Sequence, residues 1–505
     1  MEGLFGLLHG FDVVFTWQNL LFALIGCLTG MLVGVLPGVG QSAGMALLIP
    51  ITYHLDPAGA IIMLASIFYG AAYGGTITSV LMNVPGESES IVTTFEGYPM
   101  ARQGRAGAAL SISAIGSFVG GTVATVMLAV LALPISRLAL QLGPPEYATL
   151  MILGLTLAAG LLGSSIVKGL IMVVFGLMLS QIGTDPALGV TRLTFGNVNL
   201  LDGIPILAII MGFYGLSDVL LSVFKPFETG NAAARITRLL PTASDMKRSI
   251  GAIARGTGIG MMLGVLPGMA SAVSTFFSYA VERRVTRHPE EFGKGAIEGV
   301  AGPETANNAF ANASFLPLMT LGIPGSAALS ILFGALMIQG VTPGPLMFRD
   351  HPDVAWGLIA SMVVGNGILL ALSLPLIGMW VAILRLPGNL IGAIIVVVSL
   401  IGVYTVQNNP FDILALATFT LIGAGLKWLN YPLAPAILAF ILGKPIESAI
   451  GQSLNIAQGD ATVFVTRPIS LVFTLAAVAV IGMSVLRLYR EVREERESAI
   501  TERHS

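Results

Sequence analysis

Gly34-Val35-Leu36-Pro37-Gly38 ends one apolar segment and begins another, and the same five residues return at Gly264-Val265-Leu266-Pro267-Gly268, 230 positions later. Proline lacks a backbone amide proton, and glycine adopts conformations that a helix does not use, so each Pro-Gly pair predicts a helix end. A second break follows each copy, at Asn83-Val84-Pro85-Gly86 and at Gly322-Ile323-Pro324-Gly325. Paired breaks inside apolar segments of two halves are typical of secondary transporters.

The composition places the chain in a membrane. Of its 505 residues, 55% are hydrophobic and 10% are charged, whereas soluble domains carry about 25% charged residues. A net charge of -2, without a basic stripe, gives no indication of nucleic-acid binding. The single Cys27 excludes a disulfide within the chain, and residues 1–15 lack the basic region of a secretory signal, so no cleaved signal is expected.

The first half of the chain contains apolar segments that are long enough, at about 20 residues, to cross a bilayer. Residues 1–17 are expected to lie at the membrane interface, and a helical hairpin follows, with arms at 18–36 and 40–53. The segment 58–83 is rich in small residues and ends at the second break. Four ordinary spans are predicted near 107–134, 146–163, 166–182 and 203–223.

The second half repeats this order. A hairpin is predicted at 255–281 and a broken crossing at 296–340, followed by spans near 354–383, 388–406, 411–426 and 428–443, and by one extra span at 470–488. The predicted divisions are a first membrane repeat (18–223), a cytoplasmic connector (224–254), a second membrane repeat (255–445), and a C-terminal span with a cytoplasmic tail (446–505).

The distribution of basic residues predicts the orientation, because cytoplasmic loops carry an excess of Lys and Arg. With the connector and the tail on one side, 20 of the 25 basic residues lie there, and the exceptions are Arg137, Arg192, Arg349, Lys444 and Arg467. The C-terminus is therefore expected in the cytoplasm and the N-terminus outside. Each repeat makes five crossings, an odd number, so the second repeat enters from the opposite face. The sequence thus predicts an all-α polytopic membrane protein with two inverted-topology repeats, each with a hairpin, a broken helix and four further spans, plus one C-terminal span.

The breaks are the predicted substrate site. A helix that begins in mid-membrane presents unpaired amides with a partial positive charge, whereas a helix that ends there presents carbonyls to cations. Because the inner apolar segments contain almost no Lys or Arg, an anionic solute would be held by helix starts and neutral donors. The predicted substrate-binding residues are Pro37, Gly38, Gln41, Ser42, Asn83, Pro85, Gly86, Ser88, Pro267, Gly268, Ser271, Pro324, Gly325 and Ser326.

A polar run near membrane depth is the predicted site of a coupling ion. It contains Glu304, Thr305, Asn307 and Asn308. A carboxylate and amides inside a membrane are costly unless they face a cavity, a partner or an ion. Oxygen atoms of Thr305, Asn307 and Asn308 could bind sodium, and Glu304 could neutralise it or carry a proton. The alternative, that Glu304 lies at the cytoplasmic mouth near Lys294, stays open.

Each feature also has a structural interpretation. A Pro-Gly pair can be a simple kink, and the small residues from Gly70 to Gly75 can serve helix packing. Glu87 and Glu89 can be solvated loop residues. The five histidines show no metal-ligand spacing, so no metal is expected beyond a sodium ion.

Several motifs resemble the large membrane subunit of the tripartite tricarboxylate transporters, over residues 18–445. They are Gly34-Val-Leu-Pro-Gly38, Tyr69-Gly-Ala-Ala-Tyr-Gly-Gly75, Asn83-x-Pro-Gly86, Gly97-Tyr-Pro-Met-Ala-Arg-Gln-Gly-Arg105, Gly143-Pro-Pro-Glu-Tyr147, Pro303-Glu-Thr-Ala-Asn-Asn308 and Leu321-Gly-Ile-Pro-Gly-Ser326. The resemblance implies a bacterial inner-membrane permease that works with a periplasmic solute-binding protein and a small four-span membrane subunit. It also implies uptake of carboxylates driven by sodium ions or protons, without another cofactor.

One departure from the family pattern bears on the solute. After Asn83-x-Pro-Gly86 the family shows small uncharged residues, whereas Glu87 and Glu89 follow here. Two acids beside an anion site disfavour a tricarboxylate unless they bind the coupling ion or point away, so a dicarboxylate or another organic acid is an equal expectation. A passive anion channel and a permease for a different small organic solute remain alternatives. An intramembrane enzyme is not expected, because no nucleophile with its base is evident. The oligomeric state is open, with a homo-oligomer as one option.

Overall fold

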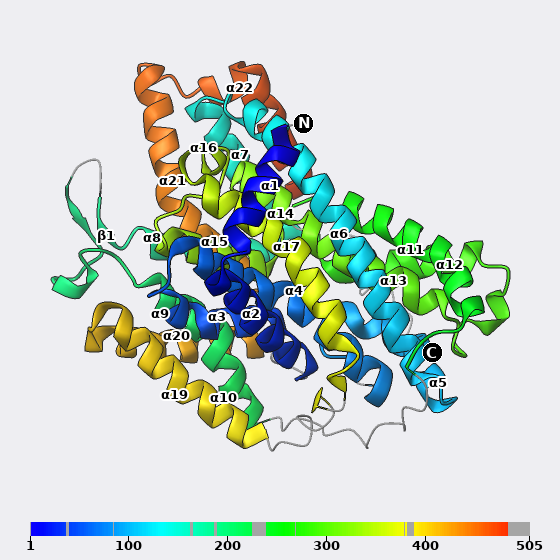
Figure 1. Cartoon of the computed structure of the whole chain (residues 1–505). Helices are drawn as coiled ribbons and strands as arrows, with labels where there is room; N and C mark the ends of the chain where they lie inside the picture. The colour runs from blue at the N-terminus through cyan, green and yellow to red at the C-terminus, as the bar shows by residue number, and fades with distance from the viewer. Residues whose placement is uncertain are drawn as a thin grey trace, which may run out of the picture. The chain divides into compact units, whose positions relative to one another are not determined.

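The computed structural model of the protein describes residues 2–36, 40–83, 85–161, 165–185, 189–224, 239–267, 269–377, 379–380 and 388–482. These residues are mostly helical, and their regular strands, β1 (Gly183–Thr184) and β2 (Thr191–Arg192), pair antiparallel (Figure 1). Six described helices are long and apolar enough to cross a membrane: α2 (Trp17–Val35), α4 (Pro57–Met82), α6 (Ala106–Ala139), α17 (Pro352–Ser373), α20 (Pro410–Trp428) and α21 (Ala434–Ile456). The predicted class, an all-α polytopic membrane protein, is confirmed.

Contacts divide the chain into two compact units. Unit 1 comprises Met1–Leu140 and Pro205–Gly425, and unit 2 comprises Gln141–Ile204 and Leu426–Ser505. The other elements of unit 1 are α1 (Glu2–Val14), α3 (Gly40–Thr52), η1 (Ser88–Ser90), α5 (Ile91–Arg102), α9 (Ile206–Ile210), η3 (Met211–Leu216), α10 (Ser217–Phe224), α11 (Ala243–Gly264), α12 (Ser271–Val285), η4 (Pro289–Glu291), α13 (Glu298–Ala313), α14 (Phe315–Leu321), α15 (Ala327–Ile338), α16 (Met347–Asp350) and α19 (Gly388–Gln407). Those of unit 2 are α7 (Pro144–Leu161), α8 (Ile166–Ser180), η2 (Val198–Leu200) and α22 (Val463–Thr466). Each compact unit combines separate stretches of the chain, so the units do not test the predicted boundaries of the two membrane repeats, which stay a prediction.

The first arm of each hairpin packs closely on the helix that leads to the second break. This arm carries glycines at a spacing of four: Gly26, Gly30 and Gly34 on α2, and Gly256, Gly260 and Gly264 on α11. A side chain at any of them would collide with a backbone carbonyl, at Met63, Ile67 and Ala71 of α4 or at Gly302, Ala306 and Phe310 of α13. Helices α2 and α4, like α11 and α13, therefore lie side by side (Figure 1). The corresponding glycines are 230 positions apart, so the sequence repeat is also a repeat of packing.

The second break ends a helix in both halves. Helix α4 ends at Asn83, whose φ of 57° is left-handed, and α14 ends at Gly322, whose φ of 70° is left-handed too. A left-handed residue at the end of a helix turns the chain away from the helix axis. The Pro-Gly pair that follows each cap thus joins two helices.

Helix α11 begins earlier than the hairpin predicted from residue 255. It starts at Ala243 because Thr242 and Asp245 form a capping box, in which the Thr242 hydroxyl accepts a 3.1 Å hydrogen bond from the Asp245 amide. One turn further on, Arg248 donates hydrogen bonds to Glu298 and Glu291, at 2.7 and 2.6 Å. This guanidinium lowers the pKa of the Glu291 carboxyl below its ordinary value. Residues 225–238 of the predicted connector lie outside the described residues.

Helix α1 covers part of unit 1 with one face. Gly6 packs on the Trp356 ring of α17, and Gly10 packs on the Trp356 carbonyl. The opposite face exposes Leu4, Phe5 and Leu8. The interfacial position of residues 1–17 stays a prediction.

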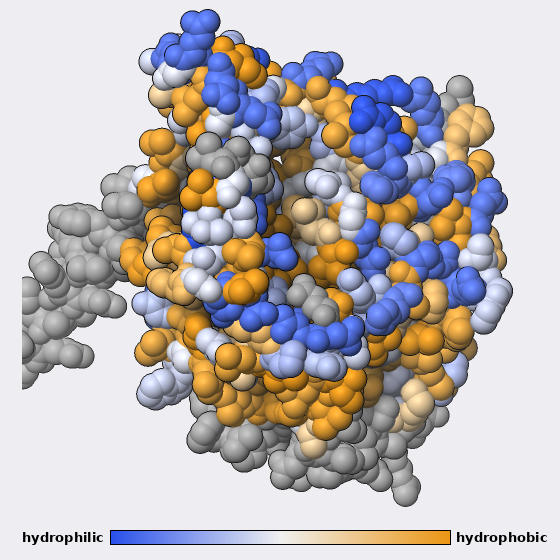
Figure 2. Space-filling view, turned by 90° about the vertical axis from the view of Figure 1, so that its left-hand side faces the viewer, coloured by the Kyte–Doolittle hydropathy of each residue, from blue (hydrophilic) through white to orange (hydrophobic). Residues whose placement is uncertain are grey.

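Large apolar side chains are exposed on several other helices, including Val174 and Met178 on α8 and Leu421 on α20. Figure 2 shows hydrophobic residues covering much of the face that it displays. An apolar outer surface is stable against lipid but not against water, so it accords with a multi-pass membrane protein.

Unit 2 is built on α21, which packs against α7 and α8. Its buried Glu146 accepts hydrogen bonds from Arg467 Nε, at 2.6 Å, and from the amide of Gly143, at 2.9 Å. Near the β1–β2 turn, Arg192 forms ion pairs with Asp185 and Glu447. The predicted motif Gly143-Pro-Pro-Glu-Tyr147 therefore has a structural role within this unit.

We expect Arg467→Ala to lower the free energy of unfolding by about 2 kcal/mol, because it leaves the buried Glu146 carboxylate without its charged donor. The measurement is thermal unfolding of the purified protein in detergent. Arg349→Ala is the control: Arg349 pairs with Asp350 at the surface, where an ion pair contributes about 0–1 kcal/mol. Equal effects of the two substitutions would contradict the structural role of the Glu146–Arg467 pair.

Candidate functional site

In each half of unit 1, the second Pro-Gly break lies beside the described end of the hairpin's first arm or its break. A side chain at Gly86 would collide with the carbonyl oxygen of Gly34, which places the second break of the first half against the end of α2. In the second half, a Cβ at Gly325 would lie 3.9 Å from the Cα of Pro267. Gly86 therefore lies against the last turn of α2 in the first half, and Gly325 lies near Pro267 in the second. Pro37, Gly38 and Gly268, at the hairpin tips, lie outside the described residues.

The two halves also contact each other across these breaks. The turn η1, directly after Pro85-Gly86, contacts α12, the second arm of the second hairpin. Helix α15, directly after Pro324-Gly325, contacts α3, the second arm of the first hairpin. In each half, therefore, the helix that begins after the second break contacts the hairpin of the other half.

Polar side chains gather where α3 begins. Gln41 donates hydrogen bonds to Glu87 and to Glu89, the latter at 2.9 Å, and Ser88 donates to Glu89 at 2.8 Å. Both carboxylates are only partly exposed, and Glu87 Oε1 is buried without a hydrogen-bond partner among the described residues. The structure therefore brings Gln41 and Ser88 together with the two acids, and the acids are not a freely solvated loop.

The other predicted substrate-binding residues have different surroundings. Ser326 accepts a 3.2 Å hydrogen bond from the Leu329 amide and so caps α15. Asn83 is exposed, and Ser42 and Pro85 are partly exposed. Ser271 donates a 2.7 Å hydrogen bond to Asn307 Oδ1, which links the start of α12 to α13. The predicted substrate and ion residues are therefore in direct contact at this point.

The Glu304 carboxylate lies in the interior of unit 1, with its residue 1% exposed. One oxygen accepts a 2.7 Å hydrogen bond from Thr76 of α4, and the other accepts one from Thr93 of α5. The Ser113 hydroxyl of α6 adjoins the same carboxylate. Glu304 thus lies between α13, α4, α5 and α6 with neutral donors around it and is not solvated, while its depth in the membrane stays a prediction.

The neighbouring polar residues of α13 face different helices. Asn308 Nδ2 donates to the Ser117 hydroxyl of α6, at 2.7 Å, while Asn308 Oδ1 is buried with no hydrogen-bond partner in the described structure. Asn307 faces α12, as described above. Thr305 donates back to the Ala301 carbonyl at 2.7 Å and packs on Gly116 and Gly120 of α6, so its hydroxyl is not directed to Glu304.

Sequence reasoning missed the partners of this cluster. Thr76, Thr93, Ser113 and Ser117 surround Glu304 and Asn308, and the buried Tyr73 hydroxyl has no hydrogen-bond partner among the described residues. The series of hydroxyl residues in otherwise apolar helices could have predicted these partners. In a membrane, such side chains form hydrogen bonds with one another or with their own backbone.

The cluster around Glu304 contains groups of the kind that bind cations. Its carboxylate, hydroxyls and amide oxygen are hard ligands of the kind that oxygen-preferring cations take. The unpartnered oxygens of Asn308 and Tyr73 add acceptors in the same region. A second acidic group, His288, Glu290 and Glu291, has ligand atoms within 4.8 Å of one another, but two of its members are exposed and Glu291 already pairs with Arg248. That group gives no reason to infer a metal.

One family model matches most of this chain. The sequence model of the Tripartite tricarboxylate transporter TctA family matches residues 20–438. The chain is 42% identical, over 98% of both lengths, to an uncharacterized 52.8 kDa protein in the TAR-I ttuC' 3' region of Agrobacterium vitis. It is 44% identical to an uncharacterized protein in the TAR-II ttuC' 3' region of the same organism, over 48% of this chain and 99% of that relative. No solved structure matches.

Proposed function

Because this chain belongs to the tripartite tricarboxylate transporter TctA family, we propose that it takes up organic carboxylates of the di- or tricarboxylate class by secondary active transport. The family match over residues 20–438 is the observation that carries this proposal. In it, a periplasmic solute-binding protein delivers the solute to the chain in the bacterial inner membrane, and a small four-span membrane subunit accompanies it.

The proposed architecture is an inverted repeat with the C-terminus in the cytoplasm and the N-terminus outside. The repeated glycine packing of α2 on α4 and of α11 on α13 supports two equivalent halves. The lysine and arginine distribution supports the cytoplasmic C-terminus, and the odd number of crossings predicted for each half supports opposite orientations of these halves.

The proposed solute site lies where the paired breaks meet. The helix starts at α3, η1, α12 and α15 would direct amide groups towards an anion. Gln41, Ser88 and Ser271 supply neutral polar groups beside them. Glu87 and Glu89 are held by Gln41, so we propose that Gln41 limits their repulsion of the solute. Two acids at this position favour a solute with fewer negative charges than a tricarboxylate.

The proposed coupling-ion site is the Glu304 cluster. In a low-dielectric interior, a carboxylate surrounded by neutral donors gains stability when it binds a cation or a proton. The Ser271–Asn307 hydrogen bond connects this cluster to α12. Cation binding would thus stabilise the second hairpin against α13 and close the solute site.

The experiment that tests the function is reconstitution in proteoliposomes together with the binding protein and the small subunit. Uptake of labelled di- and tricarboxylates is measured with an inward sodium gradient, with a proton gradient, and with neither. Accumulation that requires one of the gradients is the expected result. Equal uptake without any gradient would instead favour a passive channel.

We expect Asn308→Ala to raise the sodium or proton concentration for half-maximal uptake by about tenfold, because one ligand oxygen is lost. Asn307→Ala should act in the same direction, with an additional loss of the contact to Ser271. The measurement is uptake against cation concentration in the same proteoliposomes. An unchanged cation dependence in both variants would contradict the assignment of this cluster.

A further inference from the structure

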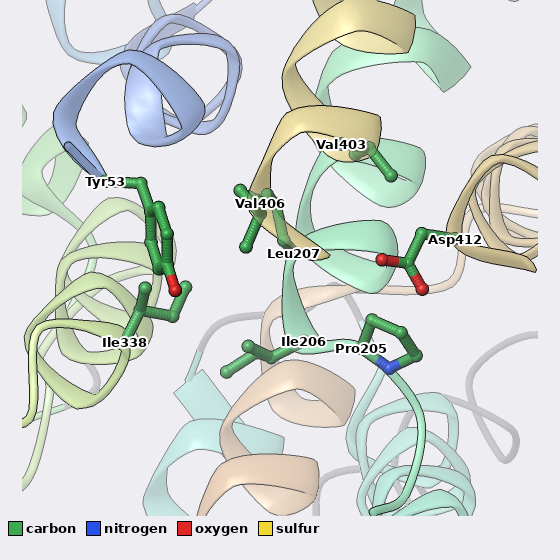
Figure 3. A pocket seen from close by; sticks show the side chains of 8 residues that line it. All are labelled: Tyr53, Pro205, Ile206, Leu207, Ile338, Val403, Val406 and Asp412. Carbon is green, nitrogen blue, oxygen red and sulfur yellow. The ribbon is translucent and has the colours of Figure 1, made fainter. Parts of the chain in front are cut away.

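A separate cavity of about 220 Å³ lies in unit 1, among the ends of five helices (Figure 3). Its lining comes from Tyr53 after α3, the start of α9, the last residue of α15, the last turns of α19 and the first turn of α20. The eight described lining residues are Tyr53, Pro205, Ile206, Leu207, Ile338, Val403, Val406 and Asp412. None of them belongs to the proposed solute site or coupling-ion site.

The cavity contains one charged group in an apolar wall. Six of the lining residues are aliphatic or proline, and Asp412 is the one with a charge. Its residue is 2% exposed, and its carboxylate makes no hydrogen bond or ion pair with another described residue. Figure 3 shows this carboxylate pointing away from its own helix, towards Leu207 and Pro205. An unpaired carboxylate in such a place is costly, so the site is incomplete without a partner.

The residues that line the cavity determine which kind of ligand could pair with Asp412. A carboxylate anion would be repelled by Asp412. A bare sodium ion or divalent cation needs several oxygen ligands, whereas the cavity offers mainly hydrocarbon. A primary ammonium group with an aliphatic stem satisfies both features, since the charge pairs with Asp412 while the stem packs on Ile206, Ile338 and Val406.

We propose that this cavity, which we call the Asp412 cavity, binds a primary alkylammonium group. Two sources supply this chemistry: a free aliphatic amine, and the ethanolamine headgroup of a phospholipid. The position suits either source, because α3 and α15 line the cavity with the ends opposite to their Pro-Gly breaks, and on the proposed architecture these ends face the membrane–water boundary. The site is independent of the transported carboxylate.

The test is the binding of n-pentylammonium to the purified full-length protein in lipid-free detergent, measured by isothermal titration calorimetry. The wild-type protein is expected to bind n-pentylammonium, but neither n-pentanoate nor sodium at the same concentration. Asp412→Asn should weaken binding by about tenfold or more, because a charge-assisted contact is lost. Val406→Trp should also weaken binding by filling the cavity while leaving the charge in place.

The matched control is Asp353→Asn. Asp353 also lies in the first turn of a helix of unit 1, but its side chain is 68% exposed and pairs with His9, so its loss should leave the affinity unchanged. Thermal unfolding of each variant confirms that it is folded. Absence of n-pentylammonium binding to the wild type, or equal binding to Asp412→Asn, would overturn the proposal.

A second measurement distinguishes the two sources. The titration is repeated in nanodiscs of phosphatidylethanolamine and of phosphatidylglycerol. Weaker apparent binding of n-pentylammonium in the phosphatidylethanolamine discs, lost in Asp412→Asn, would identify the lipid headgroup as an occupant. Equal wild-type binding in both lipids, weakened by Asp412→Asn, would identify the free amine. Either result supports the ammonium site.

Discussion

Replacing Glu304 by glutamine is expected to abolish cation-driven carboxylate uptake, with a loss of roughly 100-fold or more. Glutamine keeps the shape of the side chain, and its carbonyl can still accept a hydrogen bond from the Thr76 or Thr93 hydroxyl. What it loses is the negative charge that would neutralise a cation or carry a proton. The measurement is the initial rate of uptake in proteoliposomes with and without the coupling gradient.

Two controls separate this effect from a general loss of structure. Glu290→Gln makes the same change at a side chain that is 67% exposed, and we expect normal uptake. Glu304→Gln should still bind the proposed periplasmic solute-binding protein, because Glu304 is buried and its replacement does not alter the surface of unit 1. If Glu304→Gln keeps gradient-dependent uptake at the wild-type rate, Glu304 is a structural residue and the coupling site lies elsewhere.

Replacement of Gly260 by valine is expected to destabilise the protein by about 3 kcal/mol, the upper part of the usual range for overpacking in a core. Gly260 lies against the Ala306 carbonyl of α13. A Cβ at this position would also lie 2.7 Å from the Cβ of Ala309. The corresponding Gly30→Val, at the Ile67 carbonyl of α4, should act in the same way. The measurement is thermal unfolding together with the yield of monodisperse protein.

The same helix provides the control. Gly258 is exposed, and a Cβ at this position would meet no atom within 4 Å. We therefore expect Gly258→Val to be neutral or slightly stabilising, because valine has a higher helix propensity than glycine. Comparable losses at Gly258 and Gly260 would show that backbone flexibility, and not close helix packing, explains these glycines. A loss at Gly260 without one at Gly30 would count against equivalent roles in the two halves.

The fold followed from the sequence wherever the signal was local. Hydropathy predicted the membrane class and the long apolar spans, and the described helices α2, α4, α6, α17, α20 and α21 have the length and composition that crossing a bilayer requires. Pro-Gly pairs predicted the helix ends, and the left-handed caps at Asn83 and Gly322 each lie two positions before one of these pairs. These effects act through a residue and its immediate neighbours, so they can be read along the chain.

The start of α11 could not be predicted from the sequence. Lys247 and Arg248 suggested a solvated connector, but helix α11 already includes them. Arg248 is partnered by Glu291 and Glu298, more than 40 residues away in the chain. When the partner of a charged residue is distant in sequence, the sequence alone predicts a loop at that residue, because only folding brings the two side chains together.

The candidate site shows the same division. The sequence alone predicts Glu304 as a costly carboxylate near membrane depth, and Glu87 and Glu89 as acids beside a break. The tertiary structure decided what surrounds them: Thr76 and Thr93 lie 228 and 211 positions from Glu304, and Gln41 lies 46 positions from Glu87. The Asp412 cavity likewise exists only where five helix ends meet. Hydropathy and backbone restriction are properties of each residue, whereas the partner of a buried polar group is set by how distant helices pack.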